Sequence, residues 1–274
     1  MHLQEKPVSQ DWTEERTEAP VSFSMWELLR SIIRFSWGRP IWSWQTLVSL
    51  LLVGLAAGAV VAHRAIRGEW AEQEFFSEVL LGGYVGFLLP VLCLSFGTQL
   101  VSGAWEEGWL IWLLLRPIPR SLVYGLLLAA AVPWTLALTL GGALLLAALA
   151  GHATFRACLS ALLPLTIGSL AYLAFFVCLS VWLRRAALVS IAYVFVVENV
   201  ISYLPGWINR GSISFYIRSL LIADGPIPFE NDGILSLVPV SPTVAWTGLL
   251  IVTFAFTVAG GMIFSRREYG EGNP

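Results

Sequence analysis

The sequence predicts an all-α membrane protein with six transmembrane helices. We also expect an interfacial helix before the first span and an outer cap or re-entrant segment between spans five and six. Hydrophobic residues make up 57% of the 274 positions and charged residues only 12%, where a soluble domain has roughly 25% charged residues. The apolar residues are gathered in runs of about 20, the length that crosses a bilayer as a helix. Because so few charges cannot cover a water-facing surface, a soluble enzyme is excluded.

Six stretches have the length and apolar character of a span. They are residues 41–62, 79–101, a span within 121–154, a span within 157–183, and residues 186–203 and 244–264. Together they predict one transmembrane domain over residues 41–267, followed by a short cytoplasmic tail at 268–274.

The basic residues orient these spans. With a cytoplasmic N-terminus, 11 of the 16 fall in inner segments: Lys6, Arg16, Arg30, Arg34, Arg39, Arg116, Arg120, Arg184, Arg185, Arg266 and Arg267. The other five fall in outer segments: Arg64, Arg67, Arg156, Arg210 and Arg218. Because basic residues are enriched on the cytoplasmic side, this predicts a multi-pass protein of the cell membrane with both termini inside. Tryptophans near span ends, such as Trp44 and Trp182, suit the membrane interface.

The segment before the first span divides into two parts. Residues 1–21 are polar and acidic, without the apolar run of a signal peptide, and we expect a disordered cytoplasmic tail there. Residues 22–40 are expected to form an elbow helix in the interface. Ser24 and Glu27 have the spacing of a capping box, and Pro40 ends the segment. The helix either feeds the first span or is only a membrane-surface anchor.

The inner loop over residues 102–121 contains a short apolar helical piece. Glu106 and Glu107 precede it, and the two prolines of Arg116-Pro117-Ile118-Pro119-Arg120 end it. An acidic start and a basic end complement a helix dipole, which is one explanation of these charges. A docking surface for a cytoplasmic partner is the other.

The outer segment 203–243 contains turn signals around a helical stretch near residues 213–222. Its apolar content predicts a cap or a re-entrant hairpin rather than a plain loop. Just before it, Glu198 is the only acid well inside a span, about 20 Å from Arg185 along a helix. Intramembrane carboxylates usually serve a substrate, ion or proton site. The alternative is an acid that joins two helices by hydrogen bonds, with Asn199 or Ser202 as partners.

The sequence lacks the residues that several kinds of binding or catalytic site require. Lys6 is the only lysine, so the chain cannot contain the phosphate-binding loop GxxxxGK[ST]. A net charge of −2 offers no basic field for nucleic acid. The three cysteines and three histidines are scattered, which predicts buried structural thiols and no metal site. Glutamate-dependent membrane proteases have an arginine where this chain has Ile111 after the acidic pair, so we expect no catalytic residues.

The order of elements and the inner loop resemble the membrane subunit of type-2 ABC exporters. Glu106-Glu107-Gly108 followed by Leu113-Leu114-Leu115-Arg116-Pro117-Ile118-Pro119-Arg120 carries the resemblance. In that family an acid precedes Gly-Thr, a Leu-rich turn, and a Pro-Val motif ending in arginine. Here Trp109 follows Gly108, and Arg116 precedes the first proline. The resemblance extends over nearly the whole chain beyond residue 21.

The resemblance implies a permease that exports an unidentified substrate as a dimer with a second copy or a paralogue. Two separate ABC ATPase subunits would bind the ATP, so this chain would hold no cofactor. The ATPase-coupling loop would contain Glu106, Glu107, Gly108, Arg116, Pro117 and Arg120. Glu198 and Asn199 would face the outer part of the pathway or the cap.

Two alternatives remain open. One is an ion- or proton-coupled carrier that uses Glu198. Carriers of that class usually have internal repeats and several intramembrane charges, which this sequence lacks. The other is a membrane assembly or immunity protein that does not transport.

Overall fold

A computed structural model describes residues 44–106, 119–183, 185–200, 208–224 and 240–266. All regular elements in these ranges are helical, which confirms the predicted all-α class. In chain order they are α2 (Trp44–Arg67), α3 (Glu72–Glu74), η2 (Phe75–Leu88), α4 (Leu89–Glu106), α6 (Arg120–Ala150), α7 (His152–Trp182), α8 (Ala186–Tyr193), η3 (Val194–Glu198), η5 (Ile208–Gly211), α9 (Ile213–Asp224) and α10 (Pro242–Arg266). The segments η2 and η3 are π-helical, and η5 is a 3-10 turn. The tails, the elbow segment 22–40 and residues 107–118 lie outside the described part of the chain.

Five helices in the described ranges are long and apolar enough to cross a membrane, so the chain is a multi-pass membrane protein. They coincide with the first, second, third, fourth and sixth predicted spans. The remaining prediction, residues 186–203, corresponds to the continuous helix of α8 and η3, which ends at Glu198. At about 20 Å this helix is shorter than the ~30 Å hydrocarbon core. The six-span count therefore stays a prediction.

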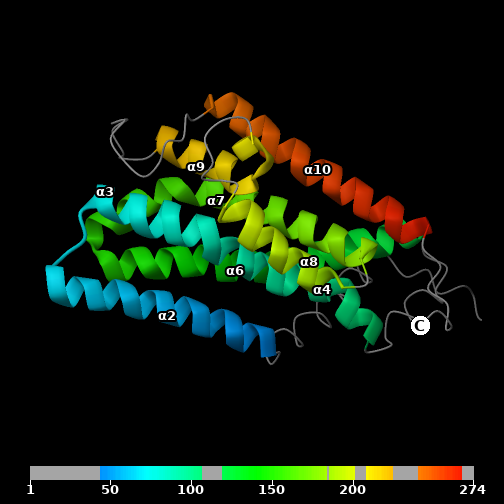
Figure 1. Cartoon of the computed structure of the whole chain (residues 1–274), viewed down its shortest axis with the longest axis horizontal. Coiled ribbons are helices and arrows are strands. Elements are labelled where there is room, and N and C mark those ends of the chain that lie inside the picture. Colours follow the sequence, from blue (N-terminus) through cyan, green and yellow to red (C-terminus); the bar gives the residue numbers. More distant parts are fainter. Residues whose placement is uncertain (1–43, 107–118, 184, 201–207, 225–239, 267–274) are drawn as a thin grey trace, which may run out of the picture.

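The central helix of the bundle is α7, which contacts α4, α6, α9 and α10. Figure 1 shows it running between α10 on one side and α6 on the other. Helices in a membrane associate by close packing rather than by a hydrophobic driving force, and small residues allow that packing. A Cβ added at Gly97 of α4 would come within 2.7 Å of the Phe176 Cβ on α7. Glycine is thus what lets α4 approach α7 so closely.

Hydrogen bonds between helices also hold the bundle. The Tyr84 hydroxyl on η2 donates to the Thr139 carbonyl on α6. The Ser169 hydroxyl on α7 lies 3.1 Å from the Thr139 hydroxyl, and its carbonyl accepts from the Cys93 thiol. The three cysteines are free and buried, as the sequence predicted. These bonds tie η2, α4, α6 and α7 together within the apolar interior, where water offers no alternative partner.

The two ends of the bundle differ. The start of α2, the end of α4 and the end of α10 lie toward one end, while α3 and the turn between α6 and α7 lie at the other (Figure 1). Trp44 and Trp182, at the ends of their helices, have 78% and 64% of their surface exposed, as expected for side chains at an interface. The segment resembling the coupling loop therefore connects α4 and α6 at the end where α2 begins.

Candidate functional site

Glu198, the last residue of η3, is fully buried. Its Oε1 accepts hydrogen bonds from the Tyr193 hydroxyl at 3.0 Å and the Ile213 backbone N–H at 3.2 Å. Its Oε2 accepts from the Ser212 hydroxyl at 2.6 Å and the Ser214 backbone N–H at 3.3 Å. A buried carboxylate is tolerated only when its oxygens are satisfied in this way.

The partners show why the carboxylate sits there. Helix α9 begins at Ile213, and the first N–H groups of a helix lack partners within the helix. The Glu198 carboxylate binds two N–H groups at this end, where a negative charge also suits the helix dipole. The Ser212 hydroxyl donates to Glu198 and lies 2.8 Å from the Ser214 hydroxyl, which can therefore donate to it. The acid thus fastens the end of η3 to the start of α9.

Two further polar side chains complete this cluster. Arg218 of α9 is fully buried, and its Nε donates to the Leu81 carbonyl of η2 at 3.2 Å. The Tyr172 hydroxyl on α7 is buried and interacts electrostatically with Glu198 and Arg218. A negative and a positive side chain therefore share one buried region, which lowers the cost of burying either.

The π-helical segments lie beside this cluster. Rings of Phe87 on η2 and Phe195 on η3 meet edge to face at 5.9 Å, and α9 packs against η2. A π-helical turn interrupts the normal bonding pattern and recurs at functional sites. Here it occurs where η2 supplies the Leu81 carbonyl to Arg218 and where η3 ends in Glu198. We call Tyr172, Tyr193, Glu198, Ser212, Ser214 and Arg218 the α9 anchor.

Asn199, the other intramembrane polar residue singled out by the sequence, does not join the α9 anchor. Its side-chain amide donates to the Val194 carbonyl at 2.9 Å and so closes the end of η3. Ser202 lies outside the described residues. The sequence singled out Glu198, and the partner it offered within the described chain, Asn199, bonds to the Val194 carbonyl instead.

The sequence placed Arg218 in the outer segment and offered no partner for it. The structure buries it completely within α9. The signal that could have found the anchor is Ser212-Ile213-Ser214 directly before an apolar helical stretch, because serine is a favoured residue at helix starts.

The predicted coupling loop is placed only at its two ends. Glu106 is the last residue of α4, and Arg120 is the first residue of α6, preceded by Pro119. The Pro119 carbonyl accepts from the Leu122 and Val123 N–H groups, which starts α6 regularly. Glu107, Gly108, Arg116 and Pro117 fall in the undescribed interior of the loop.

The described residues contain no group of three or more His, Cys, Asp or Glu side chains able to hold a metal ion. What the described residues show is a buried carboxylate, Glu198, whose two oxygens both accept hydrogen bonds at the start of α9. No protein-family model matches the chain, and no curated protein matches it either.

Proposed function

We propose that this chain is the permease subunit of an ATP-binding-cassette exporter. With a second copy or a paralogue it forms the translocation pathway in the cell membrane, and two separate ATPase subunits bind ATP. The observation that carries the proposal is the resemblance of residues 102–121 to the coupling loop of type-2 exporters. That segment joins α4 to α6 at the end where α2 begins and α10 ends (Figure 1).

In this proposal both termini and the coupling loop are cytoplasmic, as the distribution of basic residues predicts. The continuous helix of α8 and η3 enters the membrane from that side and ends partway across at Glu198. This helix forms the inner part of the predicted fifth span, residues 186–203, and α9 belongs to the outer re-entrant or cap segment. The α9 anchor then fixes this segment to the rest of the bundle.

Movement at the coupling loop would pass along packed helices. Both α4 and α6 contact α7, and α7 contacts α9 and α10. Packed cores shift between discrete arrangements rather than deforming smoothly. Closure of the ATPases against the loop would therefore tilt α4 and α6 together with α7, and α9 would follow because it packs on α7.

The contacts of Glu198 favour a positioning role in this mechanism. Its two oxygens already accept four hydrogen bonds from protein groups. A carboxylate that carries an ion or proton must exchange such partners in each cycle. The carrier alternative is therefore less well supported than a permease in which Glu198 holds the outer segment.

The test is purification of the tagged full chain from membranes of its own host in mild detergent. We expect a complex with two copies of a P-loop ATPase, identified by mass spectrometry, that hydrolyses ATP. Glu106→Ala combined with Glu107→Ala should lower the yield of complex or its ATPase rate, because both acids belong to the proposed coupling surface.

Glu72→Ala is the control, since it removes an acid at the opposite end of the bundle, on α3. A folded chain recovered without any ATPase would contradict the proposal. An unchanged complex and rate in the Glu106 and Glu107 variant would remove those two residues from the coupling surface.

A further inference from the structure

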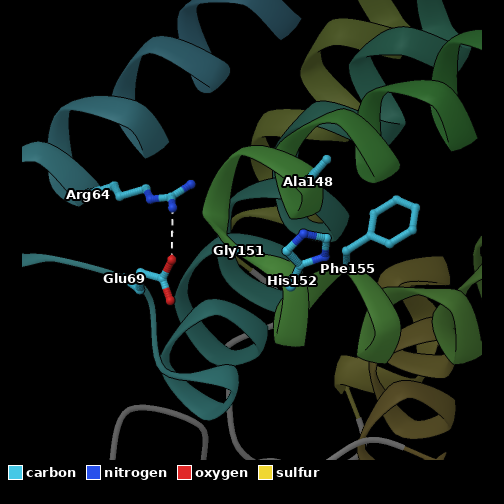
Figure 2. A pocket seen from close by; sticks show the side chains of 6 residues that line it. All are labelled: Arg64, Glu69, Ala148, Gly151, His152 and Phe155. Atoms are coloured by element: carbon cyan, nitrogen blue, oxygen red, sulfur yellow. Dashed lines mark hydrogen bonds and ion pairs between the residues drawn. The ribbon is translucent and has the colours of Figure 1, made fainter.

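A pocket of about 440 Å³ opens at the end of the bundle opposite the coupling loop. Its lining residues come from the last turn of α2, the segment after it, and the turn between α6 and α7: Arg64, Glu69, Ala148, Gly151, His152 and Phe155. Figure 2 shows Arg64 and Glu69 facing each other, with His152 and Phe155 on α7 beside them. With 24 residues, α2 is about 36 Å long and exceeds the ~30 Å hydrocarbon core. A helix of this length can cross the core and carry its basic last turn, with Arg64 and Arg67, into the headgroup layer.

The chain after α2 is folded back so that Glu69 meets Arg64. Gly68 has a φ of +94°, a conformation that glycine adopts without a steric penalty, and its N–H donates to the Arg64 carbonyl at 3.0 Å. Trp70 is buried, its indole N–H donates to the Val60 carbonyl at 3.3 Å, and its ring stacks on His63 at 3.6 Å. Fixed on both sides, Glu69 is positioned beside α2 by the fold.

The Arg64 guanidinium is held as well. One nitrogen donates to Glu69 Oε1 at 2.8 Å, and another donates to the Leu149 carbonyl of α6 at 3.0 Å. A guanidinium has five N–H donors, so further donors remain for a ligand oxygen. The Arg64 and Glu69 side chains are 42% and 73% exposed, so a ligand can reach both. Exposed pairs of this kind contribute little to stability.

The charged groups of the pocket suit a zwitterionic ligand, one that carries both a positive and a negative group. A cation and an anion lie side by side, and the first residues of α7, Gly151 and His152, line the same pocket. A phosphodiester matches Arg64, because guanidinium groups bind phosphate with directed, charge-assisted hydrogen bonds. A primary ammonium next to that phosphate matches Glu69 Oε2, the carboxylate oxygen that does not pair with Arg64.

The three helices that line the pocket also carry exposed apolar side chains nearer the middle of the bundle. One turn deeper along α2, α6 and α7 are Val61, Leu145 and Leu159, whose side chains are 45%, 47% and 48% exposed. Side chains three or four positions apart lie on the same face of a helix, so each is below a pocket residue. A ligand with a polar head in the pocket and a hydrocarbon chain on this face satisfies both regions.

We propose that this pocket binds a phospholipid with a phosphoethanolamine headgroup. Its phosphate oxygens accept hydrogen bonds from Arg64, its ammonium donates to Glu69, and its acyl chain lies along Val61, Leu145 and Leu159. A lipid is the occupant because the pocket is at headgroup depth and adjoins exposed apolar side chains. The site is independent of ATPase coupling.

The test uses the full chain, delipidated in detergent, with lipid binding measured by native mass spectrometry and by the rise in unfolding temperature. We expect phosphatidylethanolamine to bind roughly fivefold tighter than anionic phosphatidylglycerol, which lacks the ammonium. Glu69→Gln should abolish this preference. Arg64→Gln should weaken both lipids by about tenfold, because each loses a charge-assisted bond to phosphate.

Matched controls remove the same charges just outside the pocket: Arg67→Gln in the last turn of α2 and Glu72→Gln on α3. Both should bind like the wild type. The proposal is overturned if phosphatidylglycerol binds as tightly as phosphatidylethanolamine, if Glu69→Gln keeps the preference, or if the controls lose as much affinity. Glycerophosphoethanolamine, the soluble headgroup, is expected to bind far more weakly, and equal binding would assign the site to a soluble ligand instead.

Discussion

Glu198 and Glu69 are the same chemical group in opposite surroundings. Glu198 is fully buried and accepts hydrogen bonds from two hydroxyls and two backbone N–H groups. Glu69 is 73% exposed and meets the exposed Arg64 guanidinium at 2.8 Å. The buried acid fixes one segment to another, whereas the exposed acid makes a pair that solvent can reach.

Desolvation explains this difference. An ionised group deep in the protein loses its hydration, so removing any partner leaves an uncompensated charge or an unpaired donor. At the headgroup level water replaces a lost partner at little cost. The variants below test that contrast by unfolding the purified chain in detergent, followed by tryptophan fluorescence.

The largest effect is expected for Glu198→Ala, which leaves the start of α9 without its acceptor. The Ser212 hydroxyl and the Ile213 and Ser214 N–H groups would lose their bonds in a buried place, and unfolding free energy should fall by about 3 kcal/mol. Glu198→Gln should lose about half as much, because one oxygen still accepts while the new amide faces donors. Glu78→Ala, at an exposed acid of η2, is the control. If Glu198→Ala were as stable as the control, the anchor would not hold α9.

A smaller effect is expected where α9 packs on α7. A Cβ at Gly168 of α7 would come within 2.7 Å of the Ile217 Cγ1 on α9, and Ile217 is fully buried. Gly168→Ala should therefore cost about 1–3 kcal/mol through forced repacking. Gly54→Ala on α2 meets no atom within 4 Å and should be neutral or slightly stabilising. Equal stability of the two variants would mean that α9 can shift away from α7, which leaves the carboxylate as its main attachment.

The smallest effect on stability is expected for Glu69→Gln. The exposed pair with Arg64 should contribute less than about 0.5 kcal/mol, a difference that high salt should remove. A loss comparable to that of Glu198→Ala would show that the α2–α3 turn depends on this pair, and the contrast between the two acids would fail.

Much of the fold could be predicted because hydropathy is local. The runs of apolar residues placed α2, α6, α7 and α10 close to their observed bounds, and the stretch 213–222 was predicted helical, as α9 is. The polar contacts could not be predicted in the same way. Except for Tyr193, the hydrogen-bond donors to Glu198 are 14 to 16 residues further along the chain, so these bonds depend on how α9 docks.

The buried arginine Arg218 illustrates the same limit. The sequence placed it in an outer segment and indicated no partner for it. The structure buries it, and its Nε donates to the Leu81 carbonyl of η2, 137 residues earlier. No pattern in the neighbouring residues reports a contact made across the bundle.

The sequence by itself determined that this is a helical, multi-pass membrane protein, because lipid accepts only apolar helices whose backbone bonds are made internally. It also singled out Glu198 as the acid well inside a predicted span, where burying a charge is costly without partners. Only the tertiary structure decided which groups bind the Glu198 carboxylate, and that Glu69 pairs with Arg64 at the edge of a pocket. Such roles depend on which helix ends meet in space, since the cost of a charge is set by its surroundings and not by its neighbours in sequence.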